Sequence, residues 1–89
     1  MRAVITVIGK DMVGILSSIS SACAQHNANI TEVTQTIMQD LFAMIMLADI
    51  SSLNCEFHVL VNDMKALGDK MGLSVHVMHE DIFDSMHRI

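Results

Sequence analysis

The segment Leu41 to Ala48 consists of eight consecutive apolar residues. This length fits a β-strand that is covered on both faces, and it is far short of the ~20 residues that a membrane-spanning helix needs. The sequence has 89 residues, of which 52% are hydrophobic, so we expect one domain and no second domain that could cover such a strand. Helices of the same chain can cover one face. We expect a partner subunit to cover the other, so the sequence predicts an oligomer.

The rest of the chain shows alternating strand and helix patterns. The expected elements, in chain order, are a strand at Arg2–Ile8, a helix whose apolar face runs from Met12 to Cys23, a Thr-rich edge strand at Ile30–Gln39, a tight turn at Gln39-Asp40, the strand at Leu41–Ala48, a helix at Asn54–Met71, a strand at Leu73–Glu80 and a short helix at Asp81–Ile89. Gly72 is expected to end the second helix. The expected caps are Ser51, Ser52 or Asn54 for the second helix and Asp81 for the last.

This β-α-β-β-α-β order predicts a ferredoxin-like α+β fold, with a four-stranded antiparallel sheet, two helices on one face and a short C-terminal helix. Residues 1–89 form a single domain in this interpretation. The strands Arg2–Ile8 and Leu41–Ala48 are apolar on both faces, so we expect them at the centre of the sheet. The open face of the sheet is then the expected dimer surface.

Charge and composition exclude several classes of function. Five Lys and Arg against ten Asp and Glu give a formal net charge of −5, so we expect no basic surface for nucleic acid. Trp and Tyr are absent, which argues against a base-stacking platform. The chain opens with no basic-then-apolar leader. Cys23 and Cys55 lack CxxC spacing, so we expect reduced thiols and a cytoplasmic location. Because no apolar run is long enough to span a bilayer, we expect no contact with a membrane.

The segment Gly9 to Leu16 (GKDMVGIL) shows the strongest sign of a binding site. It is a glycine-bounded turn that enters a helix, and free backbone N–H groups at such a position accommodate a carboxylate or another anion. Gly14 lets a ligand or a second backbone approach closely. Gly9 and Gly14 have the spacing of a phosphate-binding P-loop, but Ile15 and Leu16 replace its Lys and Ser/Thr. A structural interpretation stays open, in which Gly9 serves the turn and Asp11 caps the helix.

The run Asp11-Met12-Val13-Gly14-Ile15-Leu16, followed by Asn29-Ile30 after the helix, resembles the ACT domain, a small regulatory module that often binds amino acids. In that family a polar residue, the glycine three positions later and an Asn that opens the second strand line a ligand site between subunits. These positions correspond to Asp11, Gly14 and Asn29. Residues 82–89 also resemble the end of short stand-alone ACT proteins of bacteria and archaea, of the UPF0237 type. The family commonly has Pro where Val13 stands, and some serine-binding members have Asn at the position of Asp11.

The resemblance implies a homodimeric sensor that binds an amino acid and acts on a separate protein. The ligand-binding residues that it implies are Asp11, Met12, Val13, Gly14, Ile15, Asn29 and Ile30. Because Asp11 attracts an ammonium group and repels a carboxylate, we expect the ligand's carboxylate on the helix amides and its ammonium group between Asp11 and Asn29.

Other interpretations remain open. The chain can be a structural dimerisation or protein-interaction module without a ligand, or an accessory regulator of transcription. An enzyme is least favoured, because no nucleophile or paired-carboxylate pattern is present. His76, His79 and Glu80 suggest a metal site, but positions 76 and 79 of a strand point to opposite faces, so we expect no metal and no cofactor. His26, His58 and His87 fit solvated positions on helices.

Overall fold

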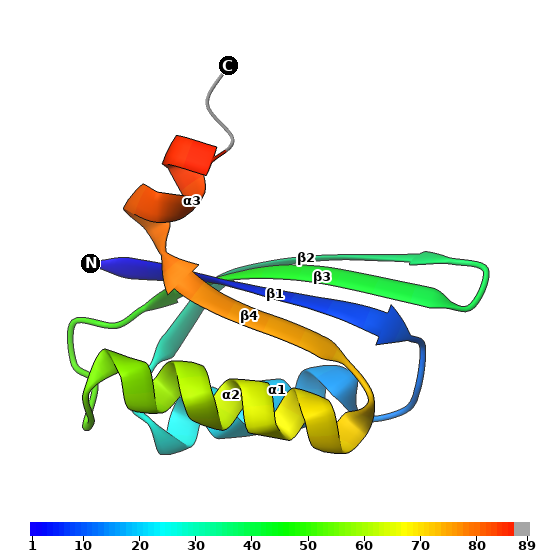
Figure 1. The fold of residues 1–89 in the computed structure, drawn as a ribbon, viewed down its shortest axis with the longest axis horizontal. Coiled ribbons are helices and arrows are strands. Elements are labelled where there is room, and N and C mark those ends of the chain that lie inside the picture. Colours follow the sequence, from blue (N-terminus) through cyan, green and yellow to red (C-terminus); the bar gives the residue numbers. More distant parts are fainter. Residues whose placement is uncertain (87–89) are drawn as a thin grey trace.

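The computed structural model describes residues 1–86 and contains one four-stranded antiparallel sheet. The strand order is β2-β3-β1-β4, and α1 and α2 cover one face while α3 stands on the other (Figure 1). The elements are β1 (Arg2–Lys10), α1 (Ile15–Gln25), β2 (Asn29–Met38), β3 (Leu41–Asp49), α2 (Phe57–Met71), β4 (Ser74–His79) and α3 (Glu80–Met86). This confirms the ferredoxin-like fold predicted from the sequence. His87 and Ile89, which the sequence analysis placed on helices, lie outside the described residues.

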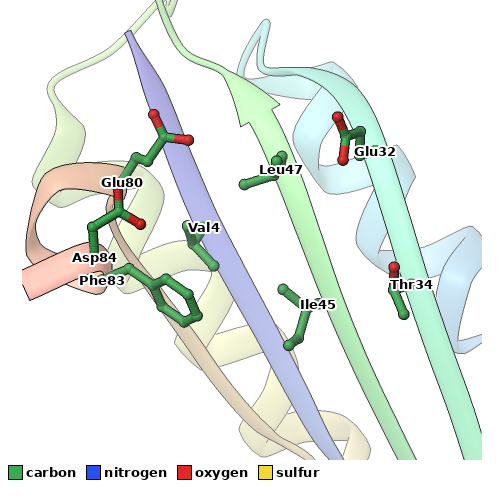
Figure 2. Close-up of a pocket in the computed structure, with 8 residues that line it drawn as sticks. All are labelled: Val4, Glu32, Thr34, Ile45, Leu47, Glu80, Phe83 and Asp84. Atoms are coloured by element: carbon green, nitrogen blue, oxygen red, sulfur yellow. The ribbon is translucent and has the colours of Figure 1, made fainter. Parts of the chain in front are cut away.

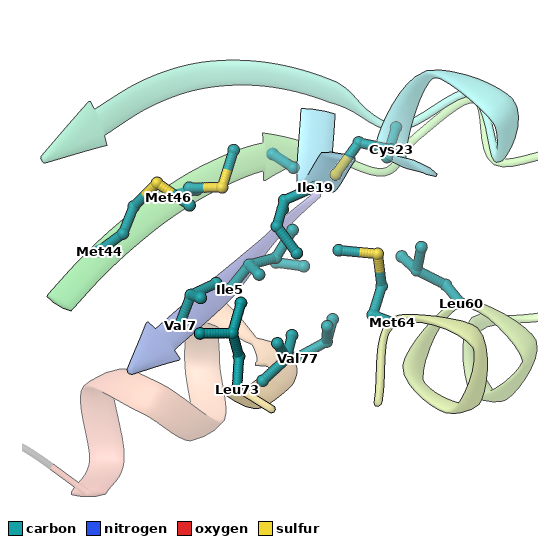
Figure 3. Close-up of a cluster of buried hydrophobic side chains, with 14 of the residues drawn as sticks. Ile5, Val7, Ile19, Cys23, Met44, Met46, Leu60, Met64, Leu73 and Val77 are labelled. Atoms are coloured by element: carbon teal, nitrogen blue, oxygen red, sulfur yellow. The ribbon is translucent and has the colours of Figure 1, made fainter. Parts of the chain in front are cut away.

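The core lies between the sheet and the two helices α1 and α2. β1 and β3 are the central strands, as predicted, and they pair from Arg2↔Asp49 to Lys10↔Leu41. Alternate residues of both strands therefore point to the helices, where the apolar stripes of α1 and α2 meet them (Figure 3). Fully buried side chains in this layer include Ile5, Val7, Ile19, Cys23, Met44, Met46, Leu60 and Met64.

α1 begins later than the apolar pattern predicts. Its first residue is Ile15 rather than Met12, because Gly14 before it has a φ of 91°, which is outside the helical region. Met12 fits the spacing of the apolar stripe but lies in the preceding loop. No side chain caps this end of α1, so the interpretation of Asp11 as a cap is wrong.

α2 also begins later than predicted, at Phe57 rather than Asn54. Glu56 before it is extended and no side chain caps the helix, so the caps expected from Ser51, Ser52 or Asn54 are wrong. The Asn54 side-chain amide instead donates to the carbonyl oxygen of Gln25 at 2.9 Å, which ties the loop before α2 to the end of α1. α2 ends at Gly72, with a φ of 74°, as predicted.

α3 covers part of the sheet face that the sequence analysis left to a partner. Val4 lies on this face, yet it is only 1% exposed, and Phe83 of α3 lies beside it (Figure 2). Arg2 at the start of β1 pairs with Glu80 at the start of α3, with 2.5 Å between Nη2 and Oε2. α3 begins at Glu80, so Asp81 lies inside the helix and the expectation that it caps this helix is wrong. The expectation that only a partner covers this face is wrong at this end of the sheet.

His26 connects the two helices that cover the sheet and is not the solvated residue expected from the sequence. Its Nδ1 lies 2.8 Å from the carbonyl oxygen of Ala22, and its Nε2 lies 2.8 Å from Oδ2 of Asp63 on α2. The side chain is 14% exposed. The Ala22 carbonyl, and then the Asp63 carboxylate, raise the pKa of His26 above its usual value because both accept hydrogen bonds from the ring.

β2 is an edge strand, as predicted, and the β2–β3 hairpin extends beyond the two helices (Figure 1). A two-residue turn at Gln39-Asp40 joins the strands, and Gln39 has a φ of 58°. The register shifts at Thr31, between Ile30 and Glu32. From there to Met38 every residue of β2 is exposed.

Candidate functional site

The corner from Asp11 to Gly14 (hereafter the corner) is an exposed connection between β1 and α1. The backbone N–H of Asp11 donates to the carbonyl oxygen of Asp40 at 2.7 Å, which fixes the corner against the β2–β3 turn. Met12 and Val13 are exposed, and nothing lies within 4 Å of the point where a Cβ on Gly14 would be. The first turn of α1 therefore presents uncapped N–H groups to open space, an arrangement that can hold a carboxylate.

Two residues at this end of the sheet serve packing. Ile15 is 2% exposed and belongs to the core, so only its backbone can reach a ligand at the corner. Gly9 lies inside β1 rather than in a turn, and a Cβ there would come within 2.5 Å of Cδ2 of Leu73. Gly14 differs, because a Cβ at this position would meet no close neighbour. The left-handed backbone conformation is what favours a glycine there.

Asn29 and Ile30 lie at the other end of the sheet from the corner. β2 ends at Met38, which pairs with Leu41, and Leu41 pairs on its other side with Lys10, just before the corner. The length of the ten-residue β2 separates Asn29 from this end, a distance of about 30 Å. Within one copy, the structure therefore does not bring Asn29 together with Asp11 and Gly14. Asn29 instead borders a cavity of about 240 Å³ at the turn between α1 and β2.

β2 carries an apolar strip, Val33 and Ile37, that the described part of the chain leaves uncovered. Val33 pairs with Met46, and Ile37 pairs with Phe42. Because both partners point into the core, Val33 and Ile37 face the helix side of the sheet, where they remain 42% and 53% exposed. β2 has one charged residue, Glu32, and neither Lys nor Pro. Beyond Glu32 and the register shift at Thr31, residues 33–38 of β2 carry no charge, Pro or bulge, and such an edge is available for pairing with another strand.

The opposite face of the sheet holds two cavities beside α3, which together we call the α3 groove. The first, about 290 Å³, lies among α3, β1, β3 and β2 (Figure 2), and the second, about 390 Å³, lies over β1, β3 and β4. Ile45 and Phe83 line both. From the sequence, this face is expected only as a dimer surface. The groove depends on where α3 lies, and the only sign of it in the sequence is the apolar spacing of Ile82, Phe83 and Met86.

Titratable side chains do not gather into a metal site in residues 1–86. No group of three or more His, Cys, Asp or Glu in this part of the chain could hold a metal ion. His76 lines the α3 groove with its Nε2 3.1 Å from Oγ of Ser74, whereas His79 stacks on Phe57 of α2 with ring centroids 4.1 Å apart. Burial raises the pKa of the free Cys23 thiol to about 11, which keeps it protonated and unreactive.

The four-stranded antiparallel sheet, with α1 and α2 on one face, defines a small ferredoxin-like α+β domain. More specifically, the chain belongs to the ACT-domain family, whose model matches residues 2–78. Among residues 1–86, no helix combines the length and the apolar character needed to cross a bilayer.

Similar proteins support this assignment over the full length of the chain. A UPF0237 protein of Methanocaldococcus jannaschii is 50% identical over 88 residues, which cover 99% of this chain and 98% of the relative. An ACT domain protein from Streptococcus pneumoniae has a TM-score of 0.81 at 31% identity, over 94% of each chain. The regulatory subunit of aspartate kinase from Thermus thermophilus, with a TM-score of 0.65 at 16% identity over 86% of this chain and 50% of that one, shares the fold alone. The first two of these matches therefore support membership of the ACT-domain family.

Proposed function

We propose that this ACT domain binds an amino acid and, as a homodimer, transmits that binding to a separate protein. The observation that carries the proposal is the bare N-terminus of α1, which is exposed, uncapped and preceded by Gly14 in a left-handed conformation. In this proposal the carboxylate of the amino acid accepts hydrogen bonds from the first turn of α1. Its ammonium group donates a hydrogen bond to the Asp11 carboxylate, and such a charge-assisted bond is stronger than one between neutral groups.

The distance between Asp11 and Asn29 in one copy supports a site shared by two copies. When two β2 edges pair antiparallel about a two-fold axis at the middle of the strand, the start of one β2 lies beside the end of the other. Asn29 of one copy then reaches the end of the sheet at which the corner of the second copy lies. The same pairing extends the sheet and covers Val33 and Ile37 of both copies, which are half exposed in one copy.

A shared site gives the domain a way to signal. An amino acid between two copies favours the dimer geometry in which both halves of the site touch it, and it can shift the dimer only by as much as its affinities for the two geometries differ. The protein that is regulated reads the changed geometry of the dimer. The likeness to the regulatory subunit of aspartate kinase supports this class of role through the fold alone.

A thermal-shift screen against the proteinogenic amino acids at millimolar concentration tests the proposal. A ligand at 100 times its Kd raises the free energy of unfolding by about 2.7 kcal/mol, which is a readily measured shift. The double variant Asp11→Ala/Asn29→Ala should lose the shift. The matched variant Asn62→Ala/Asp69→Ala, at exposed positions on α2, should keep it. If no amino acid gives a shift or a calorimetric signal with the unsubstituted protein, the sensor function is wrong, and an interaction module without a ligand takes its place.

A further inference from the structure

The floor of the α3 groove is apolar and open. Thr6, Ile8, Ala43, Ile45 and Met78 line its larger cavity together with Phe83. Ile8 and Ile45 are 50% and 46% exposed, although both sit on the two central strands of the sheet. Apolar side chains at the centre of a sheet are normally covered by a second layer, and α3 provides that layer only over Val4 and its surroundings.

The rim of the groove is acidic. Glu80 and Asp84 project from α3 on one side of the smaller cavity, and Glu32 projects from β2 on the other, with Val4, Ile45 and Leu47 between them (Figure 2). Arg2 pairs with Glu80, but Glu32 and Asp84 form no ion pair with any residue from 1 to 86. The chain as a whole carries a formal net charge of −5. Within residues 1–86, the groove therefore combines an apolar floor with two carboxylates that have no ion-pair partner.

We propose that the α3 groove is the docking surface for a basic amphipathic helix of a partner protein. A helix is about 10 Å across, and it would lie on the sheet beside α3, with its apolar face over Ile8 and Ile45. Lysine or arginine side chains on its flanks would meet Glu32 and Asp84 across the floor. This is the helix-in-groove mode of recognition, in which apolar anchors give affinity and charges set the orientation.

Charge favours such a helix over a second copy of this chain. A second copy would bring its own Glu32, Glu80 and Asp84 and another net charge of −5 to the same face. Like charges at an interface cost free energy and suppress association. The groove lies beside α3, and α3 stands on the face of the sheet away from α1 and α2 (Figure 1). A docked helix and a partner strand on the β2 edge can therefore be present together. The inference does not depend on amino-acid binding at the corner.

Two fluorescein-labelled peptides test the docking surface by fluorescence anisotropy on the full chain without added amino acids. One is a helical peptide of roughly 18 residues, or five turns, with leucine on one face and lysine on the other. The second has glutamate in place of each lysine. The lysine peptide should bind to the unsubstituted protein, more weakly as salt is raised, and the glutamate peptide should not bind.

Three variants locate the binding. Ile45→Lys places a charge on the apolar floor, and Glu32→Lys reverses the rim charge on the exposed edge strand. Both should weaken binding of the lysine peptide by at least about tenfold. Asp69→Lys makes the same charge change as Glu32→Lys on α2, on the other side of the molecule, and should bind nearly as well as the unsubstituted protein. Circular dichroism on each variant checks that it is folded, and Glu32→Lys tests the groove by itself if Ile45→Lys fails to fold.

Three results would overturn the proposal. Equal weakening in Glu32→Lys and Asp69→Lys would mean that the peptide responds to overall charge and not to the groove. Equal binding of the lysine and glutamate peptides would mean that the acidic rim of the groove does not contribute to recognition. If sedimentation shows that Ile45→Lys dissociates the homodimer, a second copy of the chain occupies the groove. The variants Asp11→Ala and Asn29→Ala should still bind the lysine peptide, so a failed amino-acid proposal leaves this test unaffected.

Discussion

Replacing Val33 by lysine should separate the proposed dimer into single copies. Val33 lies near the middle of β2 on the helix side of the sheet. In an antiparallel pair of β2 edges, the middle of one strand lies close to the middle of the other, so the two copies of residue 33 are near the two-fold axis. The variant then places two ammonium groups close together in a surface that should become buried.

The expected size of this effect follows from the exposure of the apolar strip. Complete burial of a Val or Ile side chain contributes roughly 1.5–3 kcal/mol. Because Val33 and Ile37 are 42% and 53% exposed in one copy, covering the rest is worth about 1 kcal/mol for each, or about 4 kcal/mol for two copies. Lysine at position 33 removes about 2 kcal/mol of this before any repulsion is counted. The Kd of the dimer should rise at least about 30-fold, since 1.4 kcal/mol corresponds to a factor of ten.

Sedimentation velocity over a range of protein concentrations measures this Kd directly. Ile45→Lys is the matched control, because it introduces the same side chain on a neighbouring strand but on the opposite face. We expect it to leave the dimer Kd unchanged. If Ile45→Lys dissociates the dimer and Val33→Lys does not, the copies associate through the open face, as the sequence analysis expected, and pairing of the β2 edges is refuted.

Three further predictions concern the stability of the single copy. The free energy of unfolding should fall as pH rises from about 6.5 through the higher folded-state pKa of His26, because the protonated ring is the form that its two acceptors stabilise. His26→Gln should flatten this pH dependence of the free energy of unfolding, measured by urea unfolding, and His58→Gln should not. An equal pH dependence in both variants would contradict the prediction. Gly68→Ala should destabilise the fold by up to about 2 kcal/mol, because a Cβ there lies 2.6 Å from Cγ2 of Val75 and overpacking costs about 1–3 kcal/mol against about 1 kcal/mol gained in helix propensity. An unchanged urea midpoint would show that α2 and β4 are farther apart. Gln39→Gly should stabilise the hairpin by about 0.5–1 kcal/mol, because it relieves the left-handed φ of 58°, and a lowered melting temperature would count against it.

The topology of the chain could be predicted because it depends on local patterns that repeat. Leu41 to Ala48 is apolar without interruption, so its place at the centre of the sheet followed directly. The threonines of β2 marked an edge strand, and Gly72 marked the end of α2. The first two features follow from whether water or protein covers a short stretch of chain, and hydropathy periodicity reports that property well. The third follows from the ease with which glycine adopts the left-handed conformation at a helix end.

The details that could not be predicted depend on single backbone angles or on distant partners. Met12 continues the apolar stripe of α1 in sequence, but the φ of 91° at Gly14 stops the helix short of it. The sequence predicts a solvated His26, because its hydrogen-bond partner Asp63 lies 37 positions away in the chain. The place of Phe83 over Val4 depends on the direction in which α3 leaves β4, which no spacing in the sequence specifies. The corner was found from local sequence, while its distance from Asn29 required the sheet register.

That distance makes ligand binding and dimerisation interdependent. Each copy holds Asp11 and Gly14 at one end of β2 and Asn29 at the other, so an amino acid in the proposed site bridges two copies. Dilution below the dimer Kd should weaken the apparent affinity for the amino acid, and saturating amino acid should tighten the dimer by the same factor, because the coupling is reciprocal. Val33→Lys should therefore lose amino-acid affinity, although residue 33 is about half the length of β2 from either part of the site. If monomeric Val33→Lys bound the amino acid as tightly as the unsubstituted protein, at every concentration, the corner alone would be the site and Asn29 would have no part in it.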